Sequence, residues 1–220
     1  MNDLTPTDPA LAAPLPAPKQ ARAVLTRQKL LEATITCLAR LGYAGTSTTA
    51  VVKEAGVSQG ALFRYFPTRT QLIGAAIADL FERFVRDYDG AFQAAVRAEG
   101  GDRVTLALRL LWTVFTAPPM HAVFEVYLAA RTDSDLAAAI APALHQHRAN
   151  MLAEARAIFP DLAAIPDFEL VILGVIATLQ GVALQHAALR DDAAAASELQ
   201  FVHRICAREL RGLREEAAAR

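Results

Sequence analysis

Apolar residues recur at helical spacing along most of this chain. In the first such stretch, Leu30, Leu31, Ile35 and Leu38 fall on one face of a helix that Gly42 would end. After residue 52 the residues Val, Ile and Thr are sparse, which argues against a large sheet. The pattern therefore predicts an all-α protein of about nine helices and no strands. The expected helices cover residues 24–41, 47–55, 59–66, 69–98, 102–116, 120–131, 133–159, 166–189 and 191–212.

Residues 46–66 carry the clearest local signal. Two short helices are expected there, joined by a tight Ala-Gly-Val turn at residues 55–57. Ser58 is suited to cap the second helix, and Leu62 and Phe66 are spaced to face a core. This layout is typical of a helix-turn-helix, which places its second helix in the DNA major groove.

The tip of that second helix carries side chains that suit base edges. The Gln59 amide can donate and accept in the pattern that adenine presents, and Ala61 can contact a thymine methyl. Gly60 allows the backbone to approach closely. We therefore expect these three residues to face bases. The side chains expected to contact the DNA backbone are Thr48, Thr49, Ser58, Arg64, Tyr65 and Arg69.

The run from Gly42 to Leu72, GYAGTSTTAVVKEAGVSQGALFRYFPTRTQL, resembles the DNA-binding domain of the TetR family of bacterial transcriptional regulators. The shared motifs are Gly-Tyr, the Thr-Ser pair and Ala-Gly-Val-Ser, and the resemblance covers about residues 24–84. Phe63 stands where the family usually has Tyr, so an apolar contact would replace a hydroxyl contact to phosphate. Arg69 replaces the usual Lys, which keeps the charge. The resemblance implies a homodimer that binds a double-stranded DNA operator and releases it when a small effector binds.

Charge is distributed unevenly. The chain has a net charge of −1, yet residues 19–70 hold eight basic and two acidic side chains, which leaves the remainder at −7. A basic N-terminal block suits contact with phosphate, and an acidic body does not. We therefore expect a disordered Ala/Pro-rich arm at 1–22 and a helix-turn-helix DNA-binding domain at 23–70. A linking helix would run to about residue 98 within a helical ligand-binding and dimerisation domain at 71–220.

The resemblance also implies that two C-terminal helices, at about 168–185 and 199–213, pair with a second copy in a four-helix bundle. Helical spacing places several small and apolar residues on one face of the first of these helices, and Gly181 would allow close approach. An intramolecular core is the alternative for this face. The candidate interface residues are Leu173, Ile176, Ala177, Gln180, Gly181 and Leu184.

Bulky residues in the middle helices form a candidate effector pocket. Their apolar character favours a hydrophobic or amphipathic ligand, with a histidine as a polar anchor. Plain core packing is the alternative for each of them. The candidates are Trp112, Phe115, His121, Phe124, Tyr127, Leu128 and Met151.

Signals for catalysis are missing. The sequence has no glycine-rich phosphate loop and no nucleophile elbow, and His145 and His147 lie on different faces of one helix. We therefore expect no enzymatic activity, no cofactor and no metal site. Two cysteines within helical patterns suggest reduced thiols in a cytoplasmic protein. Polar residues interrupt the apolar run at 170–187, so a buried helix is expected there and not a membrane span.

Two other functions are compatible with the same pattern. One is a ligand-binding or scaffolding helical dimer with a vestigial helix-turn-helix. The other is a transcriptional activator, which the sequence does not distinguish from a repressor.

Overall fold

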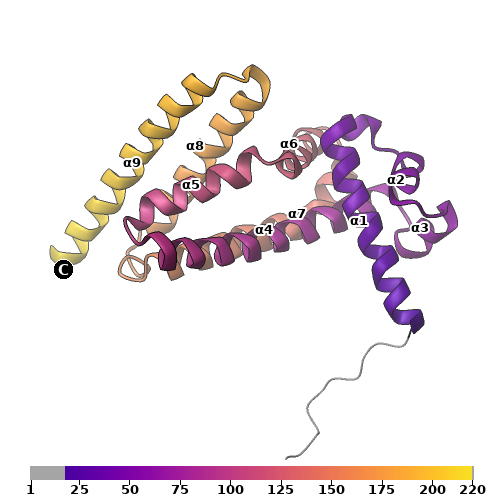
Figure 1. Ribbon diagram of the computed structural model, residues 1–220, viewed down its shortest axis with the longest axis horizontal. Helices are drawn as coiled ribbons and strands as arrows, with labels where there is room; N and C mark the ends of the chain where they lie inside the picture. The colour runs from indigo at the N-terminus through magenta and orange to yellow at the C-terminus, as the bar shows by residue number, and fades with distance from the viewer. Residues whose placement is uncertain (1–17, 220) are drawn as a thin grey trace, which may run out of the picture.

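The computed structural model describes residues 18–219, which form nine α-helices and no strand. The all-α prediction is confirmed for this part of the chain, and the residues of the expected arm that precede residue 18 lie outside it. Figure 1 shows the helices in their order along the chain. They are α1 (Pro18–Gly45), α2 (Thr48–Ala55), α3 (Gln59–Tyr65), α4 (Arg69–Glu99), α5 (Arg103–Thr116), α6 (Pro118–Ala130), α7 (Ser134–Ile158), α8 (Phe168–Leu189) and α9 (Asp192–Ala219).

The molecule is elongated, with α1–α3 at one end and the α8–α9 hairpin at the other (Figure 1). Helices α4 and α7 run side by side between the two ends and pack against each other more extensively than any other pair. Gly74 on α4 permits this close approach, because a Cβ atom there would lie 2.8 Å from the Ala139 carbonyl oxygen. Since α4 also packs on α1, a single rigid helix joins the N-terminal unit to the body.

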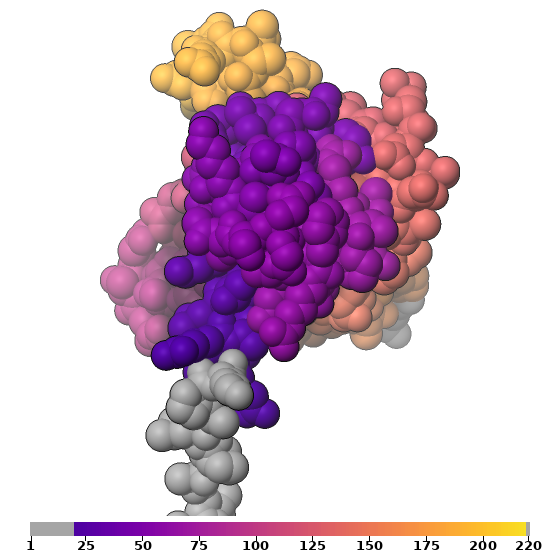
Figure 2. Space-filling view, turned by 90° about the vertical axis from the view of Figure 1, so that its right-hand side faces the viewer, coloured from indigo at the N-terminus to yellow at the C-terminus, as the bar shows by residue number. Residues whose placement is uncertain are grey.

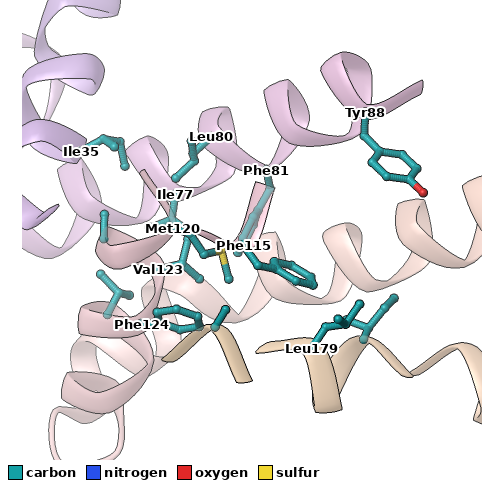
Figure 3. Packing of buried hydrophobic residues seen from close by; sticks show 14 of the residues in the cluster. Ile35, Ile77, Leu80, Phe81, Tyr88, Phe115, Met120, Val123, Phe124 and Leu179 are labelled. Atoms are coloured by element: carbon teal, nitrogen blue, oxygen red, sulfur yellow. The ribbon is translucent and has the colours of Figure 1, made fainter. Parts of the chain in front are cut away.

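One apolar core runs through the described chain without a break. Leu30, Leu62 and Ile73 join α1, α3 and α4 at the N-terminal end, and all three are fully buried. Figure 3 shows how the core continues into the body, where Phe81 and Phe115 contribute large apolar groups. Burial of such side chains is the main favourable contribution to the folding free energy. Because the core is continuous, it packs the two ends as one unit.

The backbone turns sharply near the end of α1. Gly42 has φ = 69°, a left-handed conformation that favours glycine, and it separates the main helix from a short final turn. A Cβ atom at this position would also lie 2.9 Å from the Glu125 carboxylate of α6. Gly42 therefore provides both the turn and the close approach of α1 to α6.

Several helix limits differ from the expected ones. Helix α1 begins at Pro18, so residues 18–22, assigned to the arm, are helical. Pro118 and Pro119 begin α6, where the missing N–H groups cost nothing, and do not separate it from α5 by a loop. Pro142 lies within α7. The last helix continues to Ala219, past the residue 212 at which fraying was expected.

Helix α8 is long and apolar enough to cross a membrane by length and composition alone, and 39% of its most apolar window is buried. It packs against α9, α5 and α7. The two cysteines, Cys37 and Cys206, are both buried and free, as expected.

Candidate DNA interface and internal cavity

The helix-turn-helix forms through local capping. The Ser47 hydroxyl accepts a hydrogen bond from the backbone N–H of Ala50 (3.1 Å), and the Ser58 hydroxyl accepts one from Ala61 (3.2 Å). Gly56 ends α2 in the left-handed conformation with φ = 65°. These contacts define the ends of both short helices, and the Ser58 cap and the turn at Gly56 are as the sequence predicted.

Helix α3 is held by one face and exposed on the other. Leu62 and Phe66 are buried in the core, whereas Gln59, Gly60 and Arg64 are exposed. Phe63 is 46% exposed, which is unusual for a large apolar side chain without a partner surface. Figure 2 looks onto this end of the molecule. Of the other expected DNA contacts, Thr49 and Ser58 are exposed, and Thr48, Ala61 and Tyr65 are half-buried.

The two helix tips are joined by a side-chain hydrogen bond. Gln59 Nε2 on α3 donates to Thr48 Oγ1 at the start of α2, at 3.0 Å. The second hydrogen on Nε2 and the Oε1 acceptor remain available, so the amide retains the donor and acceptor that adenine requires. This bond orients the Gln59 side chain before any DNA is bound.

Arg69, which was expected to contact phosphate, directs its guanidinium toward the protein backbone. Its Nε donates to the Thr46 carbonyl oxygen (2.6 Å) and its Nη2 donates to the Tyr43 carbonyl oxygen. The guanidinium also lies over the Tyr43 ring, 4.0 Å from its centroid. Its charge therefore satisfies carbonyl groups at the C-terminal end of α1, where a cation is favoured.

Positive charge on the exposed surface near α3 comes from three other side chains. Lys53 on α2 and Arg64 on α3 are both exposed. Arg40 is also exposed but pairs with Glu54 at 2.9 Å. Arg27 on α1 is exposed as well, with its guanidinium 5.6 Å from the centroid of the Phe66 ring. Within the described residues, these three cations are placed to meet phosphate beside the recognition helix.

Contacts between the N-terminal unit and the body were not anticipated from the sequence. The Tyr43 backbone N–H donates to Glu125 Oε2 of α6 (2.9 Å), and the Tyr43 hydroxyl donates to Asp133 Oδ2 (2.6 Å). Asp133 also caps α7 by accepting from the Leu136 N–H (2.9 Å). The Tyr43 hydrogen bond and that cap lower the pKa of Asp133. The Gly-Tyr pair was the only local signal, and it does not reveal its distant partners.

A cavity of about 90 Å³ lies in the body, lined by side chains from α4 to α9. Phe115 and Met151, both expected pocket residues, line it. Ile176, expected on the dimer face, also lines it and is buried. Other apolar lining residues are Phe84, Val104, Leu111, Ile158 and Ile172.

Five other expected pocket residues lie elsewhere. Phe124 is buried in the core and does not line the cavity, and Trp112 lies beside His186 with the rings tilted by 49° and their centroids 5.6 Å apart. Tyr127 and Leu128 are exposed on α6, and His121 is half-buried. Helical spacing identified the bulky residues, but only the rotation of each helix decides which of them reach the cavity.

Polar groups in the cavity are few. The Tyr88 hydroxyl donates to the Ala107 carbonyl oxygen (3.3 Å), and burial raises the pKa of that phenol. His147 stacks on Phe81 at 4.0 Å, and burial lowers its pKa to about 4. The His147 imidazole is therefore neutral at pH 7. Glu154 also lines the cavity, and burial raises the pKa of its carboxyl.

The expected dimer face of α8 is largely unpartnered in the single chain. Ala177, Gly181 and Leu184 are exposed, and Leu173 and Gln180 are half-buried. The exposed apolar surface of α8 also includes Leu170, which is 70% exposed. Figure 1 shows that the α8–α9 hairpin forms an outer edge of the molecule. Among the described residues, no group of three His, Cys, Asp or Glu side chains could hold a metal ion.

Comparison with known sequences agrees with this architecture. Residues 30–76 match the family described as bacterial regulatory proteins, tetR family. An uncharacterized HTH-type transcriptional regulator from Mycobacterium tuberculosis is 32% identical over 151 residues, which cover 68% of this chain and 75% of the relative. The HTH-type transcriptional repressor KstR from Rhodococcus jostii is 39% identical over 57 residues, covering 26% of this chain and 27% of KstR.

Solved structures show the same fold. The multidrug binding protein EbrR, complexed with imidazole, superposes with a TM-score of 0.59 at 22% identity, covering 81% of this chain and 93% of EbrR. The fatty acid degradation regulator FadR from Bacillus halodurans superposes with a TM-score of 0.63 at 15% identity, covering 82% of this chain and 94% of FadR.

Proposed function

The chain belongs to the TetR family of bacterial transcriptional regulators, which are not enzymes, and we propose that it is a ligand-responsive repressor. In this proposal it binds a palindromic operator as a homodimer and leaves it when a hydrophobic or amphipathic effector enters the body. The protein would act in the cytoplasm, where its DNA lies.

The exposed tip of α3 carries the proposal. Gln59 and Gly60 are exposed at a capped helix N-terminus, beside the exposed cation Arg64, while Leu62 anchors the opposite face. This combination supports a helix that enters the major groove and reads bases from its N-terminal turn. Phe63, exposed on the same short helix, would add apolar contact.

The exposed face of α8 supports a homodimer. Gly181 and Ala177 would let two copies approach closely, and Leu184 would be buried between them. A two-fold dimer presents two recognition helices, and half-sites about 34 Å apart lie one helical turn from each other on DNA. Such a dimer would read a palindrome.

The cavity supports an effector site, because it is enclosed mainly by apolar side chains and has few polar groups. EbrR, which has the same fold, is described as a multidrug binding protein, and KstR is described as a repressor. A ligand that binds one arrangement of α4 and α7 better than another would change the spacing of the two recognition helices. The contacts of Tyr43 with α6 and with the α7 cap offer the route between the cavity and the DNA-binding end.

Selection from a random duplex library at physiological salt tests the proposal. Recovery of a two-fold palindrome is expected, and the stoichiometry of the complex should be two chains per site. Recovery of an asymmetric site, or only of salt-sensitive nonspecific binding, would contradict it. The second result favours the alternative function, a ligand-binding or scaffolding dimer with a vestigial helix-turn-helix.

A further inference from the structure

The charged lining of the cavity is limited to one acidic side chain. Among its lining residues there is no Lys or Arg, and Glu154 is the only carboxylate. An anionic ligand would therefore enter a low-dielectric site without a cation to pair with and with one like charge already present, which is costly. A cation would meet a partner.

Glu154 has unused hydrogen-bonding capacity. Its Oε1 atom is buried and has no hydrogen-bond partner among the described residues. Burial raises the pKa of this carboxyl, and the negative charge of Asp89 raises it further. The ionised carboxylate is thus less favoured here than in water, and a cationic group beside it would offset both effects.

A second unpartnered polar atom lies on the same side of the cavity. His147 is 9% exposed, lines the cavity, and its Nδ1 has no partner within the described residues. His147, Met151 and Glu154 are spaced by four and three residues on α7, so they form one stripe along the helix. The neutral imidazole can donate or accept a single hydrogen bond but supplies no charge to an anion.

Size and shape restrict the remainder of the ligand. The volume of about 90 Å³ is smaller than the ~150 Å³ engineered cavity that binds benzene. Aliphatic and aromatic side chains, including Phe84, Leu111 and Phe115, enclose the rest. The space therefore suits one short alkyl chain better than a fused ring system. Figure 3 shows Tyr88 projecting from its helix into the interior with its hydroxyl at the tip.

We infer that the effector of this protein is a slim hydrophobic amine, whose ammonium group pairs with Glu154 while its alkyl chain occupies the apolar cavity. The inference rests on the proposed function, because it names the chemical class of the effector for that same site. It excludes free carboxylic acids as effectors of the cavity.

Three probes of equal chain length test the charge preference. Binding of n-butylamine, n-butanol and butanoate to the full-length protein at pH 7 is measured by calorimetry. Fluorescence of Trp112, the single tryptophan, gives a second readout because its helix also lines the cavity. We expect butylamine to bind at least tenfold more tightly than butanol, and butanoate to bind most weakly.

Substitution of the carboxylate separates charge from packing. Glu154→Gln should remove the preference for butylamine over butanol and leave butanol binding within about twofold, since an amide of similar size keeps the cavity shape. Glu82→Gln is the matched control, because Glu82 is exposed on α4 and does not line the cavity. It should bind all three probes like the unmodified protein.

The outcomes separate the chemical class of the effector from the existence of an effector site. If butanol or butanoate binds as tightly as butylamine, or if Glu154→Gln keeps the preference, the amine inference is overturned while an effector cavity remains supported. If none of the probes binds, and none shifts the protein from its selected operator, the amine inference fails together with the proposed effector site.

Discussion

The Tyr43 hydroxyl donates a 2.6 Å hydrogen bond to Asp133 Oδ2, joining the end of α1 to the cap of α7. The same tyrosine binds Glu125 through its backbone and supports the Arg69 guanidinium with its ring. One residue thus connects the DNA-binding end with two helices of the body.

Removing only the hydroxyl tests the strength of that connection. Tyr43→Phe should lower the free energy of unfolding by about 1–2 kcal/mol, because a half-buried hydrogen bond to a charged acceptor is lost. Urea denaturation gives the value. Tyr65→Phe is the matched control and should change stability by less than about 0.5 kcal/mol, as expected for a substitution that removes no such contact. Equal effects of the two substitutions would refute a special role for Tyr43.

Arg69 should matter for stability more than for DNA affinity. Arg69→Ala leaves the Thr46 and Tyr43 carbonyl groups without their charged donor, so we expect a loss of about 2–4 kcal/mol in unfolding free energy. Under conditions where the variant is folded, the dependence of DNA affinity on salt should stay unchanged. A salt slope lower by about one would instead show that the guanidinium reaches a phosphate.

Base reading and backbone binding can be separated on α3. Gln59→Ala should change the preferred base at one position in each half-site and cost about 1–3 kcal/mol on the preferred sequence. Arg64→Ala should weaken binding to all sequences alike and lower the salt slope by about one per chain. Fluorescence anisotropy on the selected operator and its single-base variants measures both. Arg97→Ala, an exposed arginine at the far end of α4, should alter neither quantity.

A charge on the exposed face of α8 should separate a homodimer. Leu184→Glu places a carboxylate where the proposed interface would be dry, so the dimer should dissociate at micromolar concentration in sedimentation experiments. Leu128→Glu is the matched control on α6, because Leu128 is 60% exposed and lies outside the proposed interface. If both variants sediment like the unmodified protein, the α8 face is not the dimer contact.

His147 should make the fold sensitive to acid. Burial lowers its pKa to about 4 from the ordinary 6.5, so the unfolded chain binds a proton that the folded chain excludes between these values. Stability should therefore be complete above pH 6.5 and fall as the pH drops toward 4, by up to about 3 kcal/mol for this residue. His147→Phe, which keeps the stacking on Phe81, should reduce that slope, whereas exposed His145→Phe should not. Equal slopes in both variants would mean that other groups dominate acid unfolding.

The sequence by itself determined the helix-turn-helix, because its signals act over a few residues. A capping serine, a left-handed Gly56 and the spacing of Leu62 and Phe66 each specify local geometry, and the structure agrees with all three. The exposure of Gln59 follows from the same local pattern. Helix limits were less certain at prolines, since Pro118 can begin a helix as readily as it can end one.

Only the tertiary structure decided which distant side chains meet. The cavity takes Phe115 and Ile176 but leaves out Trp112 and Phe124, because the rotation of each packed helix selects among bulky residues of similar spacing. The pairing of Tyr43 with Asp133 spans 90 positions along the chain. Contacts of that kind depend on how α1, α6 and α7 pack together, which no local pattern specifies.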